Sequence, residues 1–296
     1  MVTKIVLFFL NLIARLPFSL TYRLSDFLCF FVDHVFAYRR KVIIENLKYA
    51  FPEKTAQERK HIMHLFYRHF SDLVLETIKM GRMDESEFRK RLKIRNPEVL
   101  SRYYEQGKSV VILTMHYNNW EWGSHLSLYL KHTILAVYKP LHNVYFDQYM
   151  INNRSTEGTE MVKNTQVLRR IIKAKKAQQP VLVWLAADQT PPLHHTPWFV
   201  FLNRETLFYP GPATLAKQFD LPILFQHVVK TGRGCYESVV EPITENPSVI
   251  DDNEIMKAYI EKMEDAIKTQ PEYYLWSHKR WKHRRQPEEN EKATKR

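Results

Sequence analysis

Short apolar runs alternate with helical patterns through the middle of this 296-residue chain. Runs of this length, bounded by turn residues, are typical of strands buried on both faces of a sheet. The predicted strands are Val110–Met115, Ile134–Tyr138, Val181–Ala186, Leu221–Val229 and Tyr236–Val240. The helical patterns between them cover residues 119–131, 143–154, 165–178 and 211–219. This alternation predicts an α/β fold with a mixed, largely parallel sheet flanked by helices.

Helices are also predicted before and after the alternating region. Thr55 and Glu58 have the spacing of a capping box, and the apolar residues after them repeat with a helical period. Asn96 and Pro97 are typical of a helix start, with Asn as the cap and Pro at the first position. A charged amphipathic helix is expected over residues 251–270.

The segment from His116 to Glu121 directly follows the first predicted strand. The turn from strand to helix can fold the carboxylate of Glu121 back towards the imidazole of His116. A carboxylate in that place would fix the tautomer of the histidine and stabilise its cation, as a general base acting on an alcohol requires. No serine or cysteine has a comparable setting, so the activated hydroxyl is expected to belong to the substrate. The segment therefore predicts an acyltransferase.

Asp188 follows the third predicted strand closely, as His116 follows the first. Sites in sheets of this kind lie at the carboxyl ends of the strands, so the two residues are expected to share a crevice. Asp188 is interpreted as a second carboxylate of that crevice. The alternative is a turn residue in front of Pro191 and Pro192.

A metal site is a weaker interpretation of the same segment. Glu121 and His125 are one helical turn apart and could join His116 as ligands. The chain offers no clear further ligand and no spacing typical of a zinc hydrolase. We expect no metal and no other cofactor, and a metal-dependent lipid ester hydrolase is the alternative.

Positive charge is concentrated at the two ends of the chain. Of the net charge of +12, residues 1–60 carry ten Lys and Arg against five Asp and Glu, and residues 279–296 carry eight against three. Two basic ends around a nearly neutral body suit an anionic membrane surface. Nucleic acid is the competing partner, but no RNA- or DNA-binding motif appears, so none is expected.

The N-terminal segment is apolar but interrupted by charges. The uncharged run Ile5–Ala14 is shorter than the ~20 residues of a spanning helix, and the apolar residues after it are divided by Arg15, Arg23, Asp26 and Asp33. This pattern favours helices that lie in the membrane interface, with a single tilted span as the alternative. We expect a membrane-associating helical segment over residues 1–36, an acyltransferase domain over 37–285 and a polar tail over 286–296.

The two cysteines, Cys29 and Cys235, form neither a disulfide framework nor a CxxC pair. Disulfides and structural zinc are therefore not expected, and a reducing, cytosol-facing location fits best.

Several motifs occur in an order that identifies a family. They are Tyr38-Arg39-Arg40-Lys41, Asn46-Leu47, Ala50-Phe51-Pro52-Glu53, His116 to Glu121, Ala136 to Pro140, Arg154 with Gly158, Asp188-Gln189, and Trp276 with Arg280-Trp281. This ordered set, from about residue 12 to 285, resembles the bacterial lipid A biosynthesis lauroyl/myristoyl acyltransferases. They belong to the wider group of His-x4-Asp/Glu acyltransferases.

The resemblance implies transfer of a fatty acyl chain from an acyl carrier protein thioester to a hydroxyl of a membrane glycolipid. The acceptor implied is a lipid A precursor at the cytoplasmic face of the bacterial inner membrane. His116 would deprotonate the hydroxyl and Glu121 would orient the imidazole. Arg154, with N–H groups near Asn118 and Asn119, would stabilise the oxyanion, or Arg154 would bind a phosphate of either substrate.

Asp188 and Gln189 complete the expected substrate-binding residues. The acceptor is left open between a lipid A precursor, another glycolipid and a lysophospholipid, and the donor between acyl carrier protein and coenzyme A. A non-catalytic membrane-binding module that uses only the basic ends is the remaining alternative.

Asn118 departs from the family pattern, which commonly has Gly at its position. Gly in a turn indicates a backbone with positive φ, and Asn tolerates that region better than most other residues. We therefore predict that the turn from His116 to Glu121 is retained.

Overall fold

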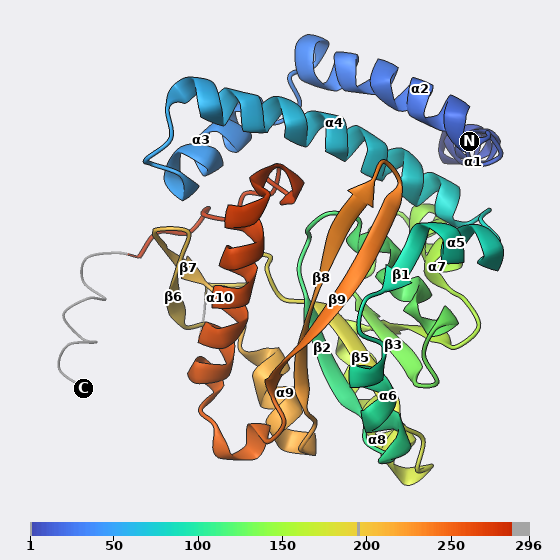
Figure 1. Ribbon diagram of the computed structural model, residues 1–296, viewed down its shortest axis with the longest axis vertical. Helices are drawn as coiled ribbons and strands as arrows, with labels where there is room; N and C mark the ends of the chain where they lie inside the picture. Colours follow the sequence, from blue (N-terminus) through green and yellow to red (C-terminus); the bar gives the residue numbers. More distant parts are fainter. Residues whose placement is uncertain (1, 194–195, 286–296) are drawn as a thin grey trace.

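The computed structural model describes residues 2–193 and 196–285, and it confirms the expected α/β fold (Figure 1). The tail predicted for residues 286–296 lies outside the described residues. A seven-stranded sheet has the order β1-β9-β8-β2-β5-β3-β4, and β6 and β7 form a separate two-stranded sheet. The strands are β1 (Leu92–Ile94), β2 (Val110–Thr114), β3 (Thr133–Tyr138), β4 (Thr159–Lys163), β5 (Val181–Ala186), β6 (Trp198–Phe201), β7 (Arg204–Leu207), β8 (Ile223–Gly232) and β9 (Cys235–Thr244).

Parallel pairing dominates the large sheet. The neighbours of β2 are β5 and β8, those of β3 are β4 and β5, and β1 pairs with β9, all in parallel register. The antiparallel pair is β8 with β9, because a tight turn joins these two strands directly. The sheet is therefore mixed and largely parallel, as predicted.

Helices cover both faces of the sheet and its carboxyl edge (Figure 1). The α-helices are α1 (Val2–Ala14), α2 (Phe18–Phe30), α3 (Arg40–Ala50), α4 (Ala56–Met80), α5 (Glu85–Arg91), α6 (Glu98–Glu105), α7 (Val144–Arg154), α8 (Val167–Lys176), α9 (Gly211–Phe219) and α10 (Asp252–Thr269). A π-helical turn, Phe31–Val35, continues α2, and 3-10 helices cover Trp120–Leu128 (η2), Asn164–Gln166, Pro247–Val249 and Pro271–Tyr273.

The sheet separates two apolar cores because successive side chains of a strand point to opposite faces. In β2, Val111 and Leu113 face the core formed with α8, α9 and α10. Val110 and Ile112 face the other core, formed with α5, α6 and η2. All five residues of β2 are buried, which explains the uninterrupted apolar run in the sequence.

Two predicted helix starts have different outcomes. The Thr55–Glu58 capping box is present at the start of α4, so that prediction is confirmed. The prediction that Asn96 caps a helix is wrong, since α6 starts at Glu98 with no side-chain cap. The amide of Asn96 exchanges two hydrogen bonds with the backbone of Val240 in β9 instead.

The first two helices pack on α4, and they leave apolar side chains facing solvent. Arg233, in the β8–β9 turn, binds Asp26 of α2 at 2.6 Å and Asp72 of α4 at 2.7 Å and so joins the two helices. Apolar residues that are at least half exposed in this segment are Val2, Ile5, Phe8, Phe9, Phe27, Phe30, Val35 and Phe36. Among the described residues, every helix is too short or too polar to cross a membrane.

Candidate active site

The site is built where two neighbouring parallel strands end. β2 and β5 pair in register, with Thr114 opposite Ala186. His116 and Asp188 each come two residues after these partners, and so the register brings them together at the carboxyl edge of the sheet. The structure confirms that the two residues come together, since they are joined by direct hydrogen bonds, and Asp188 is buried beneath the site.

Asp188 fixes both the backbone and the ring of His116. One carboxylate oxygen lies 2.7 Å from the imidazole Nδ1, and the other accepts a hydrogen bond of 3.0 Å from the backbone N–H. An ionised carboxylate only accepts hydrogen bonds, so the proton of a neutral imidazole is held at Nδ1 and the lone pair lies at Nε2. The orienting contact expected of Glu121 is therefore made by Asp188.

The His116–Asp188 pair shifts the pKa of both members. Burial alone would lower the pKa of His116, but the attraction and hydrogen bond of Asp188 outweigh it, and the pKa is raised above its usual value. For Asp188, burial would raise the pKa of the carboxyl, but His116 outweighs this effect and the pKa is lowered. The imidazole is thus a stronger base than a free histidine side chain.

Glu121 lies in η2 and is held by Arg154 at the end of α7. The guanidinium donates two hydrogen bonds of 2.8 Å to the two carboxylate oxygens. Glu121 acts on His116 through its charge, which raises the pKa of the imidazole, while Arg154 opposes that effect. The fixed fork of the guanidinium sets the position of Glu121.

Two cavities meet beside this group, and Trp120 and Glu121 line both. The indole ring of Trp120 also meets the imidazole of His116 nearly edge to face, with ring centroids 5.0 Å apart.

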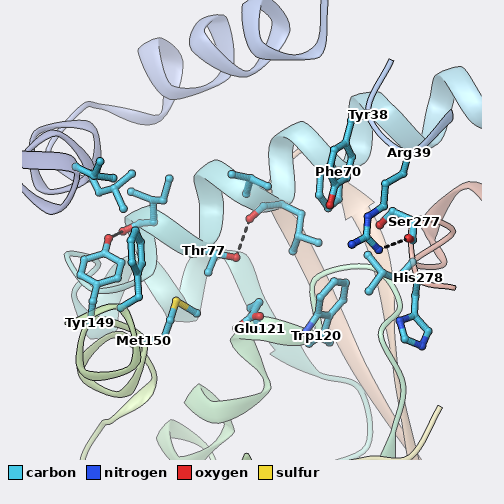
Figure 2. A pocket seen from close by; sticks show the side chains of 17 residues that line it. Tyr38, Arg39, Phe70, Thr77, Trp120, Glu121, Tyr149, Met150, Ser277 and His278 are labelled. Carbon is cyan, nitrogen blue, oxygen red and sulfur yellow. Dashed lines mark hydrogen bonds between the residues drawn. The ribbon is translucent and has the colours of Figure 1, made fainter. Parts of the chain in front are cut away.

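The first cavity, which we call the apolar cavity, has a volume of about 580 Å³. Most of its lining side chains are aliphatic or aromatic and come from α1, α4 and α7. Figure 2 shows Tyr149 and Met150 at one end and Arg39, Ser277 and His278 at the other, with Trp120 and Glu121 between them.

The second cavity, which we call the polar cavity, has a volume of about 550 Å³. His116 and Gln189 line it, and the amide nitrogen of Gln189 lies 3.1 Å from the imidazole Nε2. Its wall also carries Lys139, His142 and Arg154, which make it suited to an anionic group.

Asn118 has the backbone conformation that the sequence predicted. Its φ is +56°, so the turn is retained without glycine, and this prediction is confirmed. Its side chain is buried and donates a hydrogen bond of 3.1 Å to the carbonyl of Val228. Asn119 is also buried, and its amide nitrogen donates a hydrogen bond of 2.7 Å to the carboxylate of Glu76. Neither asparagine lines the apolar cavity or the polar cavity, and the role expected of them in substrate binding stays a prediction.

Three cavity residues received no role from the sequence. Lys139 directly follows β3, where the rule that located His116 and Asp188 applies equally, and His142 follows shortly after. His278 accepts a hydrogen bond from the backbone N–H of Thr190, and burial lowers its pKa to about 4. It comes from the C-terminal segment, far from the strand ends in sequence, and no local signal could have found it.

The metal site considered from the sequence is not assembled. His125 is buried, hydrogen-bonded to Ser124 and stacked on Phe88 with ring centroids 4.0 Å apart. It lines neither of the two cavities. Throughout residues 2–193 and 196–285, no group of three or more His, Cys, Asp or Glu is placed to hold a metal ion.

Comparisons with known proteins agree on one kind of relative. The family model for bacterial lipid A biosynthesis acyltransferase matches residues 1–283. The chain is 27% identical over 251 residues to the lipid A biosynthesis palmitoleoyltransferase of Escherichia coli (strain K12), covering 83% of this chain and 79% of the relative. It is 23% identical over 277 residues to the lipid A biosynthesis lauroyltransferase of the same organism, covering 92% of this chain and 89% of the relative.

Replacing Asp188 by Asn is expected to lower the pKa of His116. The amide is neutral, so the attraction that outweighs burial is lost and the cationic form of the imidazole is less stable. NMR titration of the His116 ring signals measures the change. An unchanged or higher pKa in the Asp188→Asn variant would show that another group sets the basicity of His116.

The backbone of Asn118 gives a second prediction. Asn118→Gly is expected to unfold at a higher temperature than Asn118→Ala, because alanine in the left-handed region is strained by about 1 kcal/mol. Asn119, buried beside it with a φ of −99°, provides the control. There the Ala variant should be the more stable of the two, because glycine has the larger conformational entropy to lose. The same order at both positions would contradict the prediction.

Proposed function

The chain belongs to the bacterial lipid A biosynthesis acyltransferase family, and on that basis we propose its reaction. A fatty acyl chain passes from the thioester of an acyl carrier protein to a hydroxyl of a membrane glycolipid, with a lipid A precursor as the best-supported acceptor. The observation that carries the proposal is the position of His116. Its orienting partner is Asp188, and the residue lines the polar cavity, where Nε2 meets the amide of Gln189.

The reaction begins at Nε2 of His116, which takes the proton of the acceptor hydroxyl. The resulting alkoxide oxygen attacks the thioester carbonyl, and a tetrahedral oxyanion forms. When this intermediate collapses, the new ester C–O bond remains and the C–S bond breaks. The proton held by His116 then passes to the departing thiolate, so His116 acts first as base and then as acid.

Asp188 and Glu121 have different parts in this mechanism. Asp188 holds the tautomer with Nε2 unprotonated and stabilises the imidazolium through a direct bond. Glu121, fixed by Arg154, adds negative potential near the imidazolium without touching it.

Gln189 is the proposed oxyanion donor. Its amide nitrogen lies 3.1 Å from Nε2 of His116, at the place where the acceptor hydroxyl must bind. Once that hydroxyl replaces the amide at Nε2, an N–H of Gln189 is released beside the reacting carbonyl. Donors placed in advance at that position stabilise the developing charge.

The two cavities suit the two chemically different parts of the substrates. The fatty acyl chain lies in the apolar cavity, because aliphatic and aromatic side chains make up most of its walls. A phosphate of either substrate lies in the polar cavity, near Lys139, His142 and Arg154.

The N-terminal helices are proposed to lie in the interface of the cytoplasmic face of the inner membrane. Their exposed apolar side chains support this position, since a contiguous apolar surface binds lipid. Val6 and Leu10 of α1 also line the apolar cavity, so this cavity adjoins the surface that would meet the bilayer. The donor and the acceptor would then reach the site from the cytosol and the membrane, respectively.

The mechanism predicts that His116→Ala lowers the transfer rate by roughly 10²–10⁴-fold without unfolding the protein. Asp188→Asn should lose more activity than Glu121→Gln, because Asp188 is bonded to the imidazole and Glu121 is not. The exposed histidine of α4, His61, provides a control that should keep full activity.

The assay uses purified protein in vesicles, acyl carrier protein thioester and lipid A precursor, with the products identified by mass spectrometry. Retained transfer by the His116 variant would overturn the mechanism. Free fatty acid as the sole product would favour a hydrolase, and a preference for coenzyme A thioesters or for lysophospholipid would reassign the donor or the acceptor.

The apolar cavity predicts a change in chain-length preference. Met150 lies at the end of this cavity away from His278 (Figure 2). Met150→Ala lengthens the space and should raise the ratio of long to short acyl chains transferred, while Met150→Trp fills it and should lower that ratio. Leu141→Ala, which changes only the polar cavity, is the control and should leave the ratio unchanged. Equal ratios in all three variants would show that the acyl chain binds outside the apolar cavity.

A further inference from the structure

Glu76 is a fully buried carboxylate near the C-terminal end of α4 that the proposed mechanism does not use. It makes no direct ion pair among the described residues, and its hydrogen-bond partners are all neutral. Burial raises its pKa, while the hydrogen bond of Tyr236 opposes that change. Burying an unpaired acid is costly, so a carboxylate kept in this place calls for a specific role.

Three neutral donors from three different parts of the chain converge on Glu76. The hydroxyl of Tyr22 in α2 donates to one oxygen at 2.9 Å. The other oxygen accepts from the amide of Asn119 at 2.7 Å and from the hydroxyl of Tyr236 in β9 at 2.8 Å. Glu76 thus connects an N-terminal helix, the sheet and the turn that begins at His116.

The hydrogen bond between Glu76 and Asn119 lies next to the proposed catalytic residues along the chain. Asn119 directly precedes η2, and its side chain makes no capping bond to that helix; its amide nitrogen donates to Glu76. Trp120 and Glu121, which line both cavities, are the next two residues of the chain.

On its other side, the turn is held by the C-terminal segment. The backbone N–H of Asn118 donates to the carbonyl of Tyr273 at 2.9 Å, and the backbone N–H of Leu275 donates to the carbonyl of His116 at 3.1 Å. Backbone bonds therefore fix the first half of the turn. The second half, where Glu121 leaves it, is held towards α4 by the side-chain bond of Asn119 to Glu76.

We propose that Glu76 is a positioning residue for acyl transfer, which holds Asn119 and thereby sets the place of Trp120 and Glu121 against His116. The inference rests on the proposed function for its activity readout.

Two substitutions of Glu76 separate its hydrogen bonds from its charge. In Glu76→Gln the side-chain oxygen can still accept from Asn119 and Tyr236, and its amide can donate to the Tyr22 hydroxyl. Glu76→Ala removes every acceptor. We expect kcat within about threefold of wild type for Glu76→Gln and at least a tenfold loss for Glu76→Ala, measured on folded protein below the unfolding transition.

Asn119→Ala breaks the same bond from the other side and keeps the test decisive if Glu76→Ala does not fold. It should lose kcat at least tenfold, and the double variant should be no worse than the poorer single variant, because both remove one interaction. Tyr22→Phe is the matched control. It removes a buried hydrogen bond from the same carboxylate but leaves Asn119 in place, so kcat should be unchanged even where the unfolding temperature falls.

The indole N–H signal of Trp120 in NMR spectra supplies a readout that does not depend on activity. This signal should shift in Glu76→Ala and Asn119→Ala and stay in place in Tyr22→Phe. The inference is overturned if Glu76→Ala keeps kcat within threefold and the Trp120 signal unchanged, or if all variants lose activity only in proportion to their unfolding temperatures. A wild-type protein that transfers no acyl chain would overturn the proposed function instead, and the Trp120 signal would still test the role of Glu76.

Discussion

The site depends on one contact, the pair of hydrogen bonds between Asp188 and His116. The contact exists because β2 and β5 are parallel neighbours in a register that places Thr114 opposite Ala186. A slip of one residue would turn every side chain of one strand to the other face and separate the pair. Such a slip would also exchange the side chains of β2 between the two close-packed apolar cores. The packing of the sheet therefore sets the tautomer and the basicity of one imidazole.

Around this contact, the turn after β2 is fixed from every side. Asn118 adopts a left-handed conformation and is tied to β8, its neighbour is tied to α4, and the C-terminal segment holds the backbone. Glu121 leaves the turn to meet Arg154 of α7. Trp120 and Glu121 of this turn line both the apolar cavity next to α1 and the polar cavity at the sheet edge. In the proposed mechanism, this arrangement would place His116 between the acyl chain and an anionic group of a substrate.

The strands that the sequence predicted differ in burial and length from those that it missed. Buried central strands such as β2 and β5 are continuous apolar runs and were found nearly to the residue. β4 is an edge strand with polar residues exposed, and β1 has only three residues, so neither produces an apolar run. The failed cap at Asn96 has a similar cause, because a tertiary partner, the backbone of Val240, competed successfully for the side chain. A local sequence pattern reflects interactions between residues that are near in sequence. It gives a wrong prediction where a residue distant in sequence binds the side chain more strongly.

The sequence by itself determined which residue types gather at the carboxyl ends of the strands. His116, Glu121, Arg154 and Asp188 could all be named from motifs and from their places after strands. Only the tertiary structure decided how they pair. Glu121 is five residues from His116 in sequence, yet the imidazole bonds to Asp188, 72 residues away, and Glu121 bonds to Arg154, 33 residues away. Two residues that are close in sequence must lie close in space, but their side chains can point in different directions. The register of two paired strands and the position of a helix end fix both the distance between two side chains and their directions.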